Sequence, residues 1–428
     1  MQRFILTVVA VTAALAAASS GPAPASGPGR LAPPAMFGAN EGRTGHYASP
    51  AVAAPVQVRW RFRTDDRVES SPAVSGGMVY VGSNDDHLYA IDAATGVERW
   101  RFRTDNDASS SPAVVAGLVY VGCDDGHLYA VDAQTGVERW RFKADGDINT
   151  SPAVAGGLVF FGSDDKHVYA VDAATGASRW RVEMEGKVQA GPAVAGDLVY
   201  VGDTKGEVRA LDAATGVQRW GFEADGAIFG APCVADGVLY VGDKEGNLFA
   251  RDAADGAAQG RFEADDDIRS SPAYAAGLLY VGSNDDHLYA IDVQAGTIAW
   301  KFRTDDDVRS SPAVAGGMVF VGSEDDHLYA IDAKTGAEQW RVATGKDVHS
   351  SPAVADGVIY IGSQDGYVYA VASQAAPAAA DIEPAASDAG AAPSADADKN
   401  TGTMILVEPD AAPPSAPPAD DDDDDDDD

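Results

Sequence analysis

The stretch "SPAVSGGMVYVGSNDDHLYAIDAATGVERWRFRT", residues 71–104, decides the fold of this chain. It contains four short runs rich in Val, Ile, Tyr, Phe and Trp, each bounded by Gly, Asp, Asn or Pro, which is typical of strands joined by turns. We predict strands at about 68–75, 78–83, 87–92 and 97–104. The connections "GG", "NDD" and "AATG" are short enough for hairpins. The unit is therefore predicted to be a four-stranded antiparallel meander.

The unit returns every 40 residues, which makes internal repetition the strongest signal in the sequence. A proline recurs eight times from Pro72 to Pro352, and Gly260 replaces one of the expected tryptophans. One such sheet cannot bury both faces, whereas radial packing covers the faces and protects the edges. We predict an all-β fold, an eight-bladed β-propeller of four-stranded antiparallel blades over residues 55–372. The repeated tryptophans are Trp60, Trp100, Trp140, Trp180, Trp220, Trp300 and Trp340.

The two ends of the repeat region indicate how the ring closes. The last repeat stops after its third strand at "YVYAVAS", and "PVQVRWRFRT" before the first full repeat is a single strand of the fourth kind. Pairing the two completes the eighth blade. We therefore expect closure by the N-terminal strand.

The flanking segments differ in composition from the repeats. Residues 1–18 are predicted to be a signal peptide, because an apolar run from Phe4 to about Ala18 is short for a membrane span and small residues follow it. Residues 19–54 are expected to be a flexible leader. Residues 373–428 form an Ala/Pro/Asp-rich acidic tail, expected to be disordered, that ends in nine aspartates. The mature protein is expected in the periplasm or outside the cell, without a membrane span.

The formal net charge of −35 excludes nucleic acid and anionic lipid surfaces as expected partners. It favours cations, a basic protein partner or simple solubility. Cys123 and Cys233 are the only cysteines, so the chain is neither a disulfide scaffold nor a CxxC protein, and both thiols are expected to be free. We expect a monomer.

At "LYAIDAATGVERW" the chain resembles the PQQ-like (pyrroloquinoline quinone-like) β-propeller repeat, and the resemblance covers residues 55–372. It implies that the fourth-strand Trp docks on the neighbouring blade near the small Ala and Gly of the motif. Gly260 then leaves a weaker seam beside the fifth blade. The family includes quinoprotein alcohol dehydrogenases and the propeller subunit of the outer-membrane protein assembly machinery. The adjacent cysteines and long insertions of the former, and the lipoprotein cysteine of the latter, are missing here.

Aspartates gather in the connections between strands 4 and 1 and between strands 2 and 3, which a meander places on one face. We name this surface the acidic face. Three interpretations stay open. The acidic face could bind cations or a basic protein partner, its aspartates could be solvated turn residues, or its charge could be an adaptation to high salt. His87, His127, His167, His287 and His327 are interpreted as sheet-edge residues, and no metal site is assigned. Representative members of the acidic face are Asp65, Asp66, Asp85, Asp86, Asp124, Asp125, Asp305, Asp306, Asp325 and Asp326.

The residue that precedes the repeated Ser pair varies from blade to blade, and the innermost strand places it at the mouth of the axial tunnel. One hypothesis is an asymmetric polar ligand pocket, in which two arginines clamp a carboxylate. The other is a tunnel lining that neutralises its own charge. The ligand-binding candidates are Glu69, Asn149, Gln189, Phe229, Arg269, Arg309 and His349. Separate partner-contact candidates in blades four and five are Arg209, Arg251, Lys205 and Lys244.

Catalytic motifs such as GxSxG, HExxH and the P-loop are missing, and no catalytic residue is assigned. The leading interpretation is a non-enzymatic binding or scaffolding module, with a role in envelope protein assembly as one option. The alternative is a PQQ-dependent oxidoreductase that would hold PQQ and calcium at the tunnel mouth.

Overall fold

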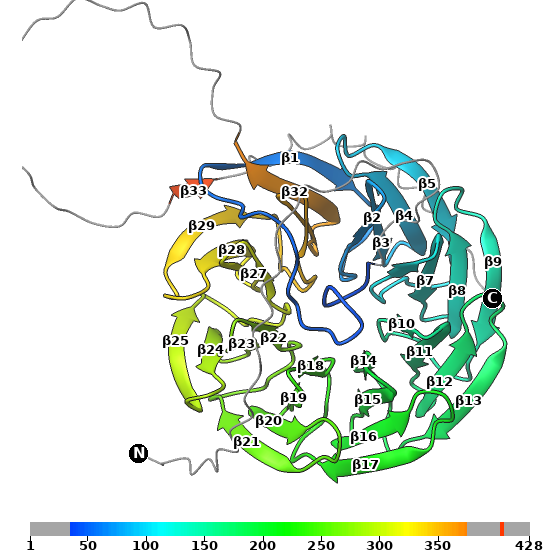
Figure 1. Ribbon diagram of the computed structural model, residues 1–428. Coiled ribbons are helices and arrows are strands. Elements are labelled where there is room, and N and C mark those ends of the chain that lie inside the picture. Colours follow the sequence, from blue (N-terminus) through cyan, green and yellow to red (C-terminus); the bar gives the residue numbers. More distant parts are fainter. Residues whose placement is uncertain (1–34, 375–402, 406–428) are drawn as a thin grey trace, which may run out of the picture.

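The computed structural model describes residues 35–374 and the backbone of 403–405. Eight sheets stand radially around one axis, each with strands in meander order (Figure 1). The predicted eight-bladed propeller of four-stranded antiparallel blades is confirmed. The predicted signal peptide, the first part of the leader and most of the acidic tail lie outside the described residues. No helix in the described part of the chain is long and apolar enough to cross a membrane.

Each blade has an inner, a second, a third and an outer strand. The inner strands are β2 (Ala73–Ser75), β6 (Ala113–Val115), β10 (Ala153–Ala155), β14 (Ala193–Ala195), β18 (Cys233–Ala235), β22 (Ala273–Ala275), β26 (Ala313–Ala315) and β30 (Ala353–Ala355). The second strands are β3 (Met78–Ser83), β7 (Leu118–Gly122), β11 (Leu158–Gly162), β15 (Leu198–Gly202), β19 (Val238–Gly242), β23 (Leu278–Ser283), β27 (Met318–Gly322) and β31 (Val358–Gly362).

The third strands are β4 (His87–Asp92), β8 (His127–Asp132), β12 (His167–Asp172), β16 (Glu207–Asp212), β20 (Asn247–Asp252), β24 (His287–Asp292), β28 (His327–Asp332) and β32 (Tyr367–Ser373). The outer strands are β5 (Glu98–Arg103), β9 (Glu138–Lys143), β13 (Ser178–Glu183), β17 (Gln218–Glu223), β21 (Ala258–Glu263), β25 (Thr297–Arg303), β29 (Glu338–Ala343) and β1 (Val56–Arg63). β33 (Thr403–Ile405) runs parallel to β29, within the stretch expected to be disordered.

The ring closes as the sequence predicts. β1 pairs antiparallel with β32 from Val56 opposite Ser373 to Arg63 opposite Tyr367, and so supplies the outer strand of the eighth blade. The first and last strands of the ring therefore share one sheet, and unfolding either end opens the circle.

The inner strands are shorter than predicted. In the first blade the inner strand begins at Ala73, whereas the sequence predicted a start at about residue 68. Pro72 has no N–H to donate to a ladder. Ser70 works through its side chain instead, since its hydroxyl oxygen accepts a hydrogen bond from the Gly82 N–H at 3.1 Å. A second set of serines links blades around the axis, and the Ser351 N–H donates to the Ser71 hydroxyl oxygen at 2.8 Å across the closure.

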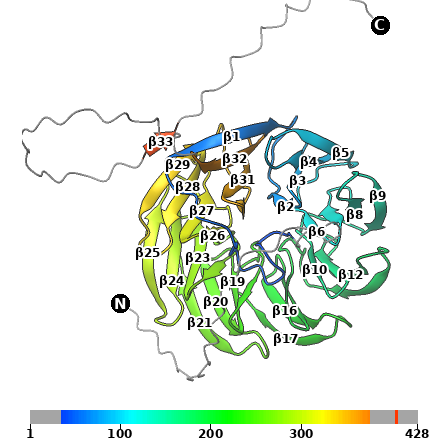
Figure 2. The same cartoon turned by 45° about the horizontal axis from the view of Figure 1, so that its top comes forward.

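Residues 35–54, the described part of the predicted leader, contact the repeats. This segment runs across the centre of the ring before it reaches β1 (Figures 1 and 2). It bonds to the inner edges of several blades: the N–H groups of Val194, Val234 and Tyr274 donate to the carbonyl oxygens of Glu41, Gly42 and Thr44 at 2.7 to 2.8 Å. Buried backbone N–H groups need acceptors, and these hydrogen bonds hold a segment without a repeat pattern in the centre.

Candidate functional site

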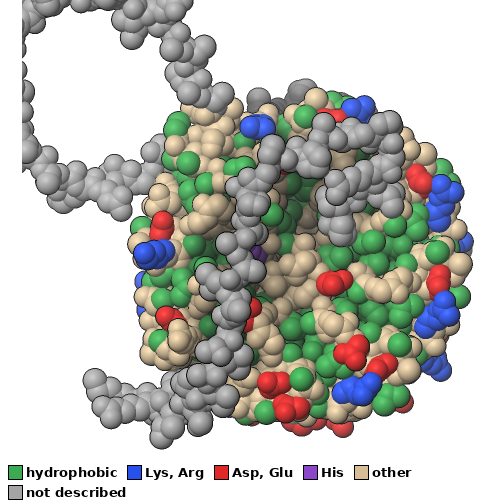
Figure 3. All heavy atoms as spheres, in the orientation of Figure 1, with side chains coloured by type: hydrophobic (Ala, Val, Ile, Leu, Met, Phe, Trp, Pro, Cys, Tyr) green, Lys and Arg blue, Asp and Glu red, His purple; other side chains and the backbone are tan. Residues whose placement is uncertain are grey.

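Hydrogen bonds between connections define the two faces of the disc. The Asp65 N–H, between an outer and an inner strand, donates to the carboxylate of Asp85, between the second and third strands, at 2.9 Å. On the other face the Ala93 N–H donates to the Gly77 carbonyl oxygen at 2.9 Å. The aspartate-rich connections therefore share one face. The face drawn in Figure 3 carries mostly hydrophobic and uncharged side chains, with acidic ones scattered among them.

Many carboxylates of the acidic face have structural partners. Asp85 also accepts a hydrogen bond from the Tyr89 hydroxyl at 2.7 Å, and the same Tyr–Asp pair recurs in five further blades. Burial is the largest cause that raises the pKa of Tyr89, followed by this hydrogen bond. These aspartates hold the turns between blades, so the interpretation as turn residues accounts for this part of the acidic face.

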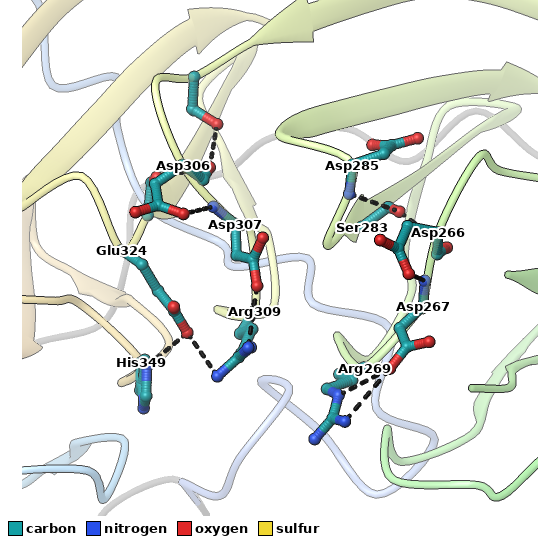
Figure 4. A network of polar contacts seen from close by, with 12 residues as sticks. Asp266, Asp267, Arg269, Ser283, Asp285, Asp306, Asp307, Arg309, Glu324 and His349 are labelled. Atoms are coloured by element: carbon teal, nitrogen blue, oxygen red, sulfur yellow. Dashed lines mark hydrogen bonds and ion pairs between the residues drawn. The ribbon is translucent and has the colours of Figure 1, made fainter. Parts of the chain in front are cut away.

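The variable ring, residue 69 and its counterparts, is half-buried in every blade, as expected for a tunnel mouth. Its best-connected part lies between blades six and eight (Figure 4). Arg309 binds Asp307 at 2.8 Å and Glu324 at 2.7 Å. Glu324 also accepts a hydrogen bond from His349 Nε2 at 2.7 Å, and Gln364 approaches His349 Nδ1 at 2.9 Å. This network balances its cation against carboxylates without a ligand.

Arg269, the second arginine of the variable ring, is also paired with a carboxylate. Arg269 binds Asp267 at 3.2 Å, and its guanidinium lies 4.9 Å from the centroid of the Phe229 ring. Figure 4 shows Arg269 and Arg309 extending side by side from neighbouring blades. A carboxylate ligand would compete with Asp267 and Asp307 for these guanidinium groups. The geometry therefore favours a self-neutralising lining over a preformed carboxylate clamp.

The opposite part of the ring is acidic. Gln189 donates to Asp164 at 3.0 Å, and Lys187 binds the other oxygen of that carboxylate at 2.6 Å. Ser109 donates to Asp124 at 2.8 Å and lies 3.5 Å from Asn149 Oδ1. Glu69 faces Arg67 at 3.5 Å.

Asp124, beside the variable ring, is the carboxylate whose ionised form is disfavoured most clearly. Its pKa is raised to about 6: burial is the largest cause, the Ser109 hydrogen bond opposes it, and the nearby charges of Asp107 and Asp147 add to it. Burial is also the first cause that raises the pKa of Asp107. A cation or a basic side chain placed here would relieve this repulsion.

Sequence reasoning missed Arg43, which is 1% exposed and lies against the inner ends of the third and fourth blades. Its Nη2 donates to the Ser151 carbonyl oxygen at 2.6 Å and its Nε to the Pro192 carbonyl oxygen at 2.5 Å. Burial lowers its pKa to about 9. A Cβ atom at Gly191 would lie 3.0 Å from Nη2, so the glycine that interrupts the repeated Ser leaves room for this arginine. The glycine in place of the repeated Ser was the one feature of the sequence that could have indicated the position of Arg43.

The partner-contact candidates do not form one free surface. Arg209 is tied to Glu207 and donates to the Glu183 carbonyl oxygen at 2.8 Å. Arg251 stacks on Phe222, with its Cζ 4.2 Å from the ring centroid. Lys205 and Lys244 are exposed. Contact with a partner at all four positions stays a prediction.

The residues present do not fit a bound quinone of the dehydrogenase kind. Cys123 and Cys233 are free and fully buried in the second and fifth blades, and burial raises the pKa of Cys123 to about 12. They cannot form the adjacent pair that the family resemblance implies for such enzymes. Among the described residues, Glu324, Asp347 and His349 could approach one cation, but Arg309 already neutralises Glu324.

Comparisons with known proteins place these observations in a family. The model described as "Outer membrane protein assembly factor BamB" matches residues 103–177, 164–267 and 244–409, more than half of the chain. No curated protein matches the sequence. BamB from Moraxella catarrhalis is similar in structure, with a TM-score of 0.66, 21% identity, and coverage of 74% of this chain and 99% of that one.

Two further solved structures have the same fold. A europium-containing methanol dehydrogenase gives a TM-score of 0.70 at 16% identity, covering 79% of this chain and 97% of its own. The computationally designed Ika8 protein gives 0.68 at 17% identity, covering 74% and 99%. At these identities the likeness concerns the fold alone, and the same ring serves an assembly factor, an enzyme and a designed protein.

Proposed function

Since the chain belongs to the PQQ-like β-propeller family, we propose that it acts as a non-enzymatic binding or scaffolding module. The chemistry of such a module resides in its surface loops and not in a central pocket. The family model named for an outer membrane protein assembly factor supports a role in envelope protein assembly. The N-terminal apolar stretch supports a location in the periplasm or outside the cell.

One observation carries the proposal: the charged groups at the mouth of the axis pair with one another, and the segment before β1 bonds to inner strands within the ring. On the acidic face the ring arginines are bound by Asp267, Asp307 and Glu324. Within the ring the segment around Arg43 bonds to the inner strands. A small anionic substrate would compete with these contacts, whereas a protein partner can approach the acidic face without disturbing them.

The charge of the acidic face supports a basic partner. The pKa of Asp124 is raised to about 6, which means that its ionised form is poorly compensated. A lysine or arginine brought to this carboxylate would gain from the field of the surrounding aspartates. Cations alone would satisfy the same chemistry and form the main competing ligand.

Site-directed photocrosslinking in the native cellular envelope tests the proposal. A photoreactive residue at exposed Asp105 or Asp145 reports on the acidic face, and one at exposed Ala94 or Ala174 reports on the other face as a matched control. We expect one discrete protein adduct from the acidic face and none from the control positions. Equal labelling from both faces, or no adduct, would argue against a binding role for this surface.

A further inference from the structure

Six seams between blades are filled in the same way. At the seam between the eighth and first blades, Trp60 Nε1 donates to the Ala93 carbonyl oxygen at 3.0 Å. The indole covers Gly96, where a Cβ atom would lie 2.7 Å from the ring. The equivalent distances at the other five glycines range from 2.6 to 2.9 Å. Each seam is thus a slot shaped for an indole with an acceptor for its N–H.

The seam between the fifth and sixth blades, between β21 and β25 in Figure 1, lacks this indole. Gly260 stands in the place of Trp, and a Cβ atom at Gly296 would have no neighbour within 4 Å. Ala250 in the slot is partly exposed, although its seven counterparts are 0% exposed. The slot is therefore open to solvent. The counterparts are Ala90, Ala130, Ala170, Ala210, Ala290, Ala330 and Ala370.

The acceptor of this slot also differs from its counterparts. Among the described residues, no hydrogen bond reaches the carbonyl oxygen of Val293, which corresponds to Ala93. In five other seams a tyrosine hydroxyl also donates to this carbonyl. Here the corresponding Tyr240 stacks against Tyr274, with ring centroids 6.2 Å apart. Within residues 35–374, neither of the two donors that serve the sister carbonyls reaches Val293.

The charge beside the slot is also uncompensated. Asp92, the counterpart of Asp292, binds Arg99 at 2.6 Å, and three further blades repeat this pair. Ala299 replaces that arginine beside Asp292. In the described part of the chain, the Asp292 carboxylate accepts hydrogen bonds only from the N–H groups of Gln294 and Ala295. An open carboxylate thus borders an open indole slot.

We propose that this slot binds a tryptophan side chain of a partner protein, inserted from a segment that carries an arginine or lysine next to it. The indole would cover Gly296 and donate to Val293, and the cation would pair with Asp292. The chain cannot fill the slot with a tryptophan of its own, because the segments outside the description contain none. The inference rests on the proposed binding function and adds the chemistry of the ligand.

Calorimetric titration of the purified chain with blocked peptides tests the inference. The probe is acetyl-Arg-Trp-Arg-amide, and acetyl-Arg-Ala-Arg-amide and acetyl-Glu-Trp-Glu-amide are controls. We expect saturable binding of the first, no measurable binding of the alanine peptide, and about two- to fivefold weaker binding when the flanking charges are reversed. Asp292→Asn should remove this preference for basic flanks.

The variant Gly260→Trp fills the slot from within and should abolish binding of the tryptophan peptide. Gly260→Ala adds only a methyl group, 4.0 Å from Ala250, and should retain it. Binding of the tryptophan peptide that survives in Gly260→Trp, or no binding to the native chain, would overturn the inference. It would also be overturned if the native chain associates with itself and Gly260→Trp abolishes that association, because the slot would then bind a second copy of the chain. A negative result here with a positive photocrosslink on the acidic face would leave the proposed function standing.

Discussion

The indole N–H of Trp340 donates to the carbonyl oxygen of Val52 at 2.8 Å, across 288 residues of sequence. In other seams the acceptor lies in the turn before the outer strand of the next blade. The eighth blade has no such turn, because its outer strand is β1, and Val52 supplies the acceptor instead. The segment before β1 thus completes the last seam as well as the axis.

Replacing this tryptophan should weaken the ring more than replacing any half-exposed counterpart. Trp340 is 1% exposed. We expect Trp340→Ala to lower the free energy of unfolding by about 3 to 5 kcal/mol, because it leaves a cavity and an unpaired carbonyl. Denaturant unfolding gives the value. The matched variant Trp300→Ala, at a partly exposed site, should cost less; an equal loss would refute a special role in closure.

Arg43 should be coupled to the glycine that faces it. Arg43→Ala is expected to cost about 3 kcal/mol or more, since two buried carbonyl oxygens lose their donor. Gly191→Ser should lower the free energy of unfolding of the native chain. In the Arg43→Ala background the same substitution should lower it by at least about 1 kcal/mol less. Chemical denaturation of the four variants forms the double-mutant cycle. Arg59→Ala, at an exposed site, should lie within about 0.5 kcal/mol of the native chain. Additive effects would contradict the packing described here.

Filling the empty seam should stabilise the ring. Gly260→Trp adds an indole where a Cβ atom meets nothing closer than Ala250 at 4.0 Å. We expect a gain of about 1 to 2 kcal/mol in the free energy of unfolding from the buried apolar surface and the new hydrogen bond. A thermal melt measures it. A lower melting temperature would mean that the slot differs in shape from the other seams.

Two aspartates should give opposite pH dependences. The pKa of Asp124 is raised to about 6, so its stabilising contribution is complete below about pH 4 and is lost as the pH rises towards 6. Asp124→Asn should remove that loss and gain stability relative to the native chain from pH 4 to pH 7. Hydrogen bonds from Arg99 and then Thr95 lower the pKa of Asp92 to about 2. Its contribution is therefore present above about pH 4 and lost as the pH falls towards 2.

Unfolding followed from pH 2 to pH 7 checks both variants. Asp92→Asn should show its largest deficit above pH 4 and almost none near pH 2. The same sign of pH dependence for Asp124→Asn and Asp92→Asn would contradict the contacts assigned to these carboxylates.

The fold was predictable from the sequence because its determinants repeat. The period of 40 residues, the alternation within each unit, the single strand at the start and the missing fourth strand at the end led to eight blades and their closure. The central segment has no such signal, since Arg43 acts through single contacts with carbonyls more than 100 residues away. The same holds for the lining of the mouth. The sequence indicated that Arg309 and His349 lie at the mouth. It could not show that both bind Glu324, because that contact depends on how neighbouring blades are offset.

Titration of the mature chain with PQQ and calcium, followed by dye-linked oxidation of alcohols and sugars, tests the central claim most directly. If the ring arginines are neutralised by their own carboxylates and the protein works through its surface, the titration should show no saturable quinone binding and the assay no turnover. Stoichiometric quinone binding with turnover, lost in Arg309→Ala, would contradict this account and establish the oxidoreductase alternative.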